Sequence, residues 1–232
     1  MKLLALDTAT QACSVALRLG ETELTRYEEP GRGHAEMILP MVDAVLREAG
    51  IALRDLDALA VGRGPGTFTG VRIAISVAQG LAFGAGLKVI PVSDLAALAQ
   101  RGVPPLQIDI CTIVACMDAR MGDVYWAVYE VGADGLVAPA LPERLSRPDE
   151  VEAAGSGWIA MGTGWAAYPQ LLERLTGAGR APQVVVATAL PRAQEILRLA
   201  ERDWRLGRAL LPEQALPVYL RDKVTHDLSQ KT

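Results

Sequence analysis

The chain has 232 residues, of which half are hydrophobic and 22% are charged, so it can bury a large core and is not a disordered chain. Its length exceeds that of a typical single domain, which favours two lobes. Its formal net charge of −4 argues against unaided binding to the phosphate backbone of a nucleic acid.

Two features of the sequence bear on its cellular compartment. The apolar run before Asp7 is too short for the hydrophobic region of a signal peptide or for a membrane span, so we expect a cytoplasmic protein with no membrane partner. Cys13, Cys111 and Cys116 show no CxxC or Cys–His spacing suited to zinc, and we expect them to be reduced, buried thiols.

Strands and helices alternate in the first hundred residues. The hydrophobic periodicity predicts strands over 2–6, 13–19, 22–27, 56–61 and 87–92, and helices over 34–49 and 71–83. Three strands, a helix, a strand and a helix follow one another in the order of an actin-like (ribonuclease-H-like) lobe. We therefore predict an α/β fold whose first lobe, residues 1–100, has a mixed sheet flanked by helices.

Turn-forming residues gather at 100–105, which we interpret as the crossing between two lobes. Beyond it a second, reduced actin-like lobe is predicted for residues 106–189. Its elements are strands over 110–117, 124–131, 157–161 and 183–187, and a helix over 165–175. A long helix over 190–208 is predicted to pack back on the first lobe, and residues 211–232 are predicted to form an extended tail.

Two loops of the first lobe carry polar groups suited to an anion. Leu6–Thr10 (LDTAT) places a carboxylate and two hydroxyls on the turn where actin-like kinases hold phosphates and Mg²⁺, but hydrogen bonds within the turn are the favoured explanation for them. Gly62–Gly70 (GRGPGTFTG) joins a strand to a helix and could cradle an anion or form a rigid turn; it lacks the Gly–Lys–Ser/Thr ending of a P-loop. The candidate anion or nucleotide residues are Asp7, Thr8, Thr10, Gly64, Gly66 and Thr67.

The chain has only two histidines, His34 and His226, near opposite ends of the sequence. A histidine-based triad or a two-histidine metal site would require those ends to meet. We therefore predict no hydrolase constellation and no two-histidine metal site, and name no catalytic residue and no metal ligand. Arg192, Arg198, Arg202, Arg205 and Arg208 could form a positive stripe for RNA, although interspersed acids favour a solvated helix face.

Several motifs together resemble the TsaB (YeaZ) family. They are Leu6–Thr10 followed by Cys13–Ala16, His34 at the start of a helix, Gly64–Arg72 (GPGTFTGVR), Asp118–Arg120 (DAR) and Pro217–Arg221 (PVYLR). The resemblance extends from the first strand to the C-terminal tail. It implies two actin-like lobes and a non-catalytic subunit that binds and activates a TsaD-type transferase, beside a TsaE-type ATPase, in threonylcarbamoylation of adenosine 37 of tRNAs that read ANN codons.

The resemblance also carries expectations about sites and partners. Where TsaD has two metal-binding imidazoles this chain has Asp94 and Leu98, so no transferase centre is expected. The family meets TsaD through the helices over 34–49 and 71–83, which by spacing alone could equally be buried in their own lobe. The predicted interface residues are Met37, Met41, Val45, Ile75, Ala78 and Ala82. The same surface is expected to form a homodimer when the chain is alone, tRNA is expected to be bound through the complex, and ATP or ADP only at a subunit boundary.

Two alternatives from other classes are open. An actin-like ATP-dependent phosphotransferase would bind Mg-ATP through Asp7 and the glycine loop of residues 62–70. A free RNA-binding protein would bind tRNA without partners, with an affinity that falls as salt rises.

Overall fold

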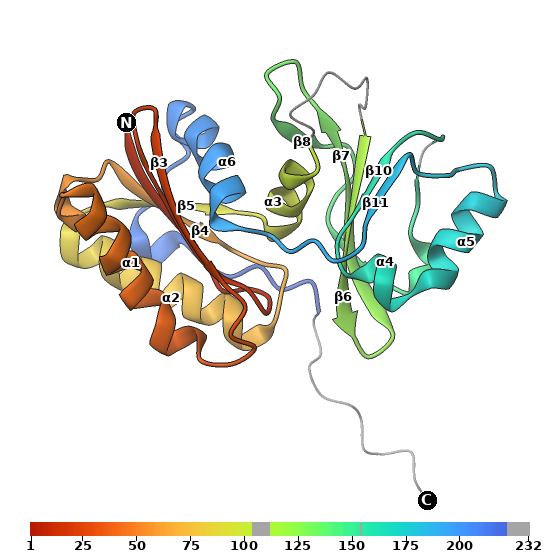
Figure 1. Cartoon of the computed structure of the whole chain (residues 1–232), viewed down its shortest axis with the longest axis horizontal. Helices are drawn as coiled ribbons and strands as arrows, with labels where there is room; N and C mark the ends of the chain where they lie inside the picture. Colours follow the sequence, from red (N-terminus) through yellow and green to blue (C-terminus); the bar gives the residue numbers. More distant parts are fainter. Residues whose placement is uncertain (104–111, 154, 222–232) are drawn as a thin grey trace, which may run out of the picture.

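The computed structural model describes residues 1–103, 112–153 and 155–221. Cys111, His226, part of the predicted interlobe crossing (104–105) and the last eleven residues of the predicted tail (222–232) lie outside the described residues. The chain forms two mixed α/β lobes, each built on its own sheet, with helices on both faces of the first sheet (Figure 1).

The first sheet has the strand order β3-β2-β1-β4-β5. Its strands are β1 (Lys2–Asp7), β2 (Cys13–Leu19), β3 (Thr22–Glu28), β4 (Ala58–Gly62) and β5 (Lys88–Val92). Strands β1, β2 and β3 pair antiparallel, whereas β1, β4 and β5 pair parallel. The central strands β1 and β4 are almost continuously apolar because both their faces are covered. This is the strand order expected of an actin-like lobe.

Helices α1 (His34–Ala49) and α2 (Phe68–Ala85) cover one face of this sheet (Figure 1). The bounds of α1 are those predicted, and the helix ends at Gly50, whose positive φ suits a glycine cap. Helix α2 begins three residues before the predicted start because the Oγ1 of Thr67 caps it by accepting a hydrogen bond from the Gly70 amide at 3.2 Å.

The second sheet is also mixed, with the order β11-β10-β6-β7-β8 and with β9 paired to β7. Its strands are β6 (Thr112–Arg120), β7 (Asp123–Val131), β8 (Val137–Pro139), β9 (Arg144–Ser146), β10 (Ile159–Met161) and β11 (Val184–Val186). Short strands β8 and β9 were not predicted. The helix predicted over 165–175 is two helices, α4 (Gly164–Ala167) and α5 (Pro169–Gly177), because Tyr168 precedes a proline and leaves the helical conformation.

A layer of two helices, α3 (Asp94–Arg101) and α6 (Ala193–Arg205), lies between the two sheets (Figure 1). Helix α6 contacts β1, β2, β4 and β5 of the first sheet, and α3 contacts β6, β7 and β8 of the second. One continuous hydrophobic core includes Leu3 of β1, Leu98 of α3, Ile196 of α6 and Ile113 of β6. The lobes therefore share a core through this layer.

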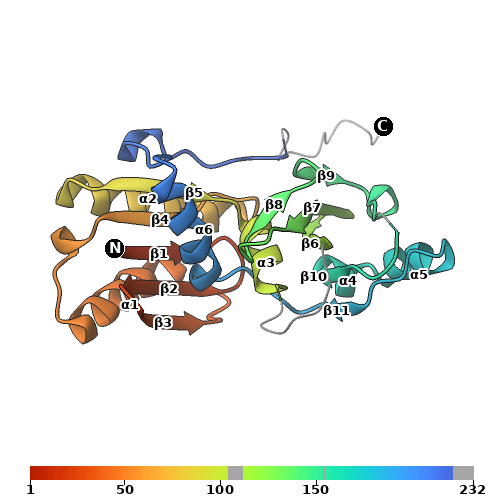
Figure 2. The same cartoon turned by 90° about the horizontal axis from the view of Figure 1, so that it is seen from above.

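The chain after α6 runs along the first lobe towards the second (Figure 2). Leu210 forms an antiparallel bridge with Val89 at the edge of β5, and Ala215, just after the 3₁₀ helix Pro212–Gln214, is fully buried against the first lobe. At residue 221 the described chain reaches the second lobe, where Arg221 Nη2 lies 2.9 Å from Asp123 Oδ2. This strap, residues 208–221, thus covers a sheet edge and joins the two lobes. Two further 3₁₀ helices, Leu53–Asp55 and Pro148–Glu150, lie in loops.

Candidate functional site

The glycine loop, residues 62–70, packs against the turn that follows β1 and is hydrogen-bonded to it. The Thr67 amide donates to the Ala9 carbonyl at 2.7 Å, and the Thr8 Oγ1 donates to the Gly70 carbonyl at 2.7 Å. A side chain at Gly66 would meet the Ala9 carbonyl at 2.5 Å, so only glycine permits this approach. Several loop amides already have protein acceptors, which contradicts a fully open anion cradle.

The six candidate anion residues divide into two groups. Asp7 and Thr8 are fully buried, and Gly64 lies under the strap, where an added Cβ would be 2.8 Å from the Val218 carbonyl. These three residues therefore have structural positions in the loops and do not line the interlobe cavity described next. Thr10, Gly66 and Thr67, in contrast, line a cavity of about 400 Å³ between the lobes.

This interlobe cavity has polar groups from both lobes. The second lobe contributes Asp118, Arg120 and Thr163, and the Thr163 Oγ1 accepts a hydrogen bond from the Asp118 amide at 3.2 Å. Arg120 has a positive φ at the end of β6, and its exposed guanidinium pairs with Asp118 at 3.1 Å. Hydroxyls, an amide side chain and a guanidinium that converge in this way can hold a small polar or anionic ligand.

A second cavity, of about 420 Å³, adjoins the first and shares Thr10, Gln11, Thr67 and Arg120 with it. It extends to the start of α1, where Arg32 and His34 line it. The Nε2 atom of His34 is buried and has no hydrogen-bond partner among the described residues. The two cavities thus lie next to each other, one between the lobes and one between the glycine loop and the start of α1.

Below the glycine loop, Asp7 and Asp94 bring two carboxyl groups together in the protein interior. Both residues are 0% exposed. Asp7 Oδ1 accepts from the Ala9 amide at 2.8 Å, and Asp94 Oδ2 accepts from the Gly64 amide. Burial raises the pKa of Asp7 to about 6, and burial together with the charge of Asp7 raises the pKa of Asp94 well above its ordinary value.

Comparisons of the sequence with a family model and with known proteins agree on the family of this chain. The sequence model described as TsaD, tRNA N6-adenosine threonylcarbamoyltransferase, matches residues 27–224. The tRNA threonylcarbamoyladenosine biosynthesis protein TsaB of Escherichia coli K12 is 41% identical, over 97% of this chain and 96% of that protein. The Haemophilus influenzae protein of the same name is 40% identical, over 97% and 95%. The chain belongs to the TsaB family.

Solved structures agree with this membership. YeaZ from Pseudomonas aeruginosa is 45% identical with a TM-score of 0.86, and the similarity covers 94% of this chain and 99% of that one. A second crystal structure, of an uncharacterized P. aeruginosa protein with similarity to peptidase YeaZ, gives the same identity and TM-score over 95% and 99%. The actin-like fold predicted for this TsaB-family chain is confirmed.

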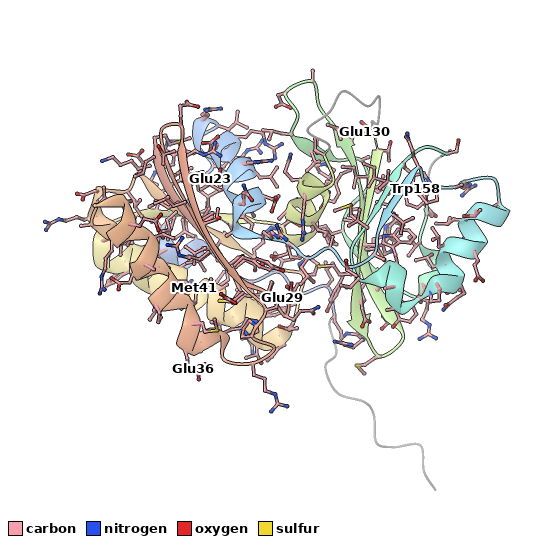
Figure 3. The ribbon with its side chains drawn as sticks, viewed as in Figure 1. Glu23, Glu29, Glu36, Met41, Glu130 and Trp158 are labelled. Atoms are coloured by element: carbon pink, nitrogen blue, oxygen red, sulfur yellow. The ribbon has the colours of Figure 1, made fainter. Side chains whose placement is uncertain are left out.

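The predicted partner residues of this TsaB-family chain need correction. Met41, Val45, Ile75, Ala78 and Ala82 are all buried in the core of the first lobe, and Met37 is partly buried. Met41 points from α1 towards β2, where its Sδ lies 3.6 Å from the Cys13 Sγ (Figure 3). These residues share a helical face as predicted, but that face packs on the sheet and is not available to a partner.

The opposite faces of α1 and α2 reach solvent. Leu39 is 47% exposed on α1, and Phe83 is 82% exposed on α2. Along the first half of α2 a groove of about 370 Å³ is lined by Ala35 of α1 and by Phe68, Thr69, Arg72, Ile73, Ser76 and Val77 of α2. The sequence analysis did not identify this surface, although the helical spacing that groups the inward-facing residues also groups the outward-facing ones.

Helix α2 is apolar enough to cross a membrane by length and composition, a test that core helices of soluble proteins also pass.

The strap adds a second unpredicted feature to the start of α2. The guanidinium of Arg72 lies 3.4 Å from the centre of the Phe68 ring, and its Nε donates to the Tyr219 hydroxyl at 2.7 Å. Tyr219 is 147 residues from Arg72 in the sequence, so no local pattern indicates this pair.

Of the five arginines on and beside α6, three are held by neighbouring groups, and the other two, Arg198 and Arg205, are exposed. Arg192 stacks over Tyr27 with its Cζ 4.5 Å from the ring centre, Arg202 donates to the Val137 carbonyl at 2.9 Å, and Arg208 pairs with Asp203 at 2.8 Å. These interactions disfavour a continuous RNA contact. Within residues 1–103, 112–153 and 155–221 there is no cluster of three or more His, Cys, Asp or Glu side chains that could hold a metal ion.

Proposed function

We propose that this chain is a non-catalytic subunit of the machinery that attaches threonylcarbamoyl to tRNA, and that it binds and activates a TsaD-type transferase. The similarity over nearly the whole chain to proteins named tRNA threonylcarbamoyladenosine biosynthesis protein TsaB carries this proposal. The target is adenosine 37 of tRNAs that read ANN codons. A TsaE-type ATPase is the third member, and the complex works in the cytoplasm and supplies the contact with tRNA.

Asp94 and Leu98 support a role without catalysis. By resemblance, they occupy the positions at which TsaD-type transferases carry two metal-binding imidazoles. Leu98 is fully buried in the core between the lobes and has no lone pair for a metal, and the Asp94 carboxyl is engaged with the Gly64 amide.

The outer surface of α1 and α2 supports docking of a protein partner. Its groove is lined mainly by apolar and small residues, with Phe68 and Arg72 at one end. Phe83 exposes most of a large apolar side chain at the other end of α2. Exposed apolar surface of this kind is typical of protein interfaces, and aromatic and arginine side chains often dominate their binding energy. When the transferase is absent, we expect the same surface to pair two copies of the chain.

The interlobe cavity supports a narrower proposal about nucleotides. It has the hydroxyls of Thr10 and Thr67 and the guanidinium of Arg120. However, Asp7 is buried beneath the loop and faces Asp94, not the cavity. We therefore expect no resident cofactor in the chain alone, and ATP or ADP only where a partner completes the site.

Reconstitution tests the main proposal. Modified adenosine is scored by mass spectrometry of nucleosides from tRNA incubated with threonine, bicarbonate, ATP, an enzyme that makes threonylcarbamoyl-adenylate, and TsaD- and TsaE-type proteins. We expect modification to require this chain. Modification that continues unchanged without the chain would refute the proposal.

One substitution then tests the docking surface. Ser76 is exposed and lines the groove, so Ser76→Arg fills the groove with a charged side chain without entering the core. We expect Ser76→Arg to reduce binding of the TsaD-type partner at least tenfold, as measured by calorimetry. The matched control is Thr176→Arg, an equally exposed helical position on α5 of the second lobe, which should bind normally. Equal binding by both variants would exclude this groove as the interface.

The alternative of an actin-like phosphotransferase is tested by titration of the chain alone with Mg-ATP. Tight binding in the absence of any partner, together with a chain that is dispensable in the reconstitution, would favour the phosphotransferase.

A further inference from the structure

The side chains of Asp7 and Asp94 form a buried carboxyl pair that packs against Gly62. Asp7 ends β1 and Asp94 begins α3, 87 positions later in the sequence. A Cβ atom built on Gly62 would lie 2.5 Å from Asp94 Oδ1 and 2.7 Å from Asp7 Oδ1. Both carboxyl groups therefore lie against the same glycine, at the end of β4 where the glycine loop begins.

Two of the four carboxyl oxygens of the pair have no backbone hydrogen bond. One oxygen of each carboxyl accepts a backbone amide, that of Ala9 or of Gly64. The others, Asp7 Oδ2 and Asp94 Oδ1, are buried and have no hydrogen-bond partner among the described residues. Two ionised carboxylates packed against the same glycine in the interior would repel each other, and neither would be hydrated. A proton on Asp94 removes the repulsion and gives the pair a donor for the Asp7 carboxylate, so that a single buried charge remains.

We propose that Asp7 and Asp94 hold one proton between them at neutral pH, and that this proton keeps the glycine loop closed against β1 and α3. Asp94 is thus a positioning residue for the loop. The inference is independent of the proposed function, because it rests on groups that face the interior of the chain.

Burial, together with the negative charge of Asp7, favours the proton on Asp94. Burial raises the pKa of both residues, and the charge of Asp7 raises that of Asp94 further, well above its ordinary range. The Ala9 amide, then the Asp94 carboxyl and the Thr8 amide, and last the charge of His34 partly offset the effect of burial on Asp7, whose pKa is about 6. Arg63 lowers the pKa of Asp94 only as a minor cause, and it already pairs with Glu143 at 3.3 Å. Cys13 of β2 is a neutral thiol, because burial raises its pKa to about 11.

Asp94 holds the loop at two points. Its amide donates to the Gly64 carbonyl at 3.0 Å, and its carboxyl accepts from the Gly64 amide. The adjoining Arg63 carbonyl accepts from the Val218 amide at 2.8 Å, so the strap lies on the same loop. Loss of the shared proton would place a second charge in the pair, and hydrating that charge requires the loop to move away from α3. We therefore expect the strap to loosen with the loop.

The direction of the pH dependence follows from linkage. Both pKa values are raised in the closed form, so the closed form binds protons more tightly than an open, hydrated form does. The pair's contribution to closure is therefore complete at low pH. It weakens as the pH rises through the pKa of Asp7 and is lost as the pH passes that of Asp94.

Carbon-13 NMR of the aspartate side-chain carboxyls in the full chain, between pH 4 and 10, tests the proposal directly. We expect one carboxyl to titrate near pH 6 and a second to titrate at clearly higher pH. The Gly64 amide resonance should follow the second step, and amide exchange in residues 62–70, corrected for the intrinsic pH effect, should accelerate with it. Two ordinary steps below pH 5, or a Gly64 amide that does not sense the second step, would overturn the proposal without any variant.

Substitutions assign the two steps. Asp94→Asn keeps the shape and donates a hydrogen bond to ionised Asp7, so the alkaline step should vanish while the step near pH 6 remains. Asp7→Asn removes the neighbouring charge and should lower the pKa of Asp94. Asp43→Asn, at an exposed position of α1 that pairs with Arg47, is the control and should alter neither step. An Asp94→Asn protein that keeps the alkaline step would assign that step elsewhere and contradict the pairing.

Discussion

At the scale of single residues, the carboxyl pair depends on the absence of a side chain at Gly62. An alanine methyl there would meet both buried carboxyls at 2.5–2.7 Å and would have to separate them or shift β4. We expect Gly62→Ala to lower the free energy of unfolding by about 1–3 kcal/mol, the usual cost of overpacking, in urea denaturation. Gly80→Ala is the matched control, since the site is open on the outside of α2 and alanine favours helix by about 1 kcal/mol. Equal effects from the two substitutions would contradict the tight packing at Gly62.

At the scale of elements, the strap explains how the edge of the first sheet is protected. Strand β5 is the last strand of that sheet, and Val89 exchanges two hydrogen bonds with Leu210, at 2.9 and 2.8 Å. We expect a chain truncated after Arg208 to lose hydrogen-exchange protection at the Val89 amide, because an uncovered edge exposes its polar groups to water. The Ala60 amide, in the central strand β4, serves as the internal reference and should exchange as before. Unchanged protection at Val89 would mean that the strap does not guard this edge.

At the scale of the whole molecule, the shared core predicts that the lobes unfold together. Leu98 of α3 is fully buried in the core between the sheets, and a side chain on Gly162 of the second lobe would meet its Cδ2 at 2.6 Å. Leu98→Ala should therefore cost about 2–5 kcal/mol and shift the transition of both lobes by the same amount. Tryptophan fluorescence reports the second lobe and α6, whereas far-ultraviolet circular dichroism reports both lobes. Midpoints that separate between the two signals would show that the lobes are independent.

Much of the architecture follows from local sequence. Helix α1 has the predicted bounds because its apolar residues recur at helical spacing and a glycine stops it. The order of strands and helices was sufficient to predict two actin-like lobes. Helix α3 was missed because it is only eight residues long and its apolar residues continue from β5 with little periodicity. The Asp7–Asp94 carboxyl pair and the contacts of the strap join residues that are too distant in sequence for any motif to connect.

The sequence by itself determined which residues of α1 and α2 share a face, because helical spacing is a local property. Only the tertiary structure decided which face is buried. Helix α2 is apolar nearly all round, so its pattern is compatible with either orientation, and packing on β4 turns Ile75 and Ala78 inward and leaves Phe83 in solvent. In the same way, the sequence specified Asp7 and Asp94 as acids, but their perturbed protonation arises from burial and from a neighbour 87 positions away, which only the folded chain brings together.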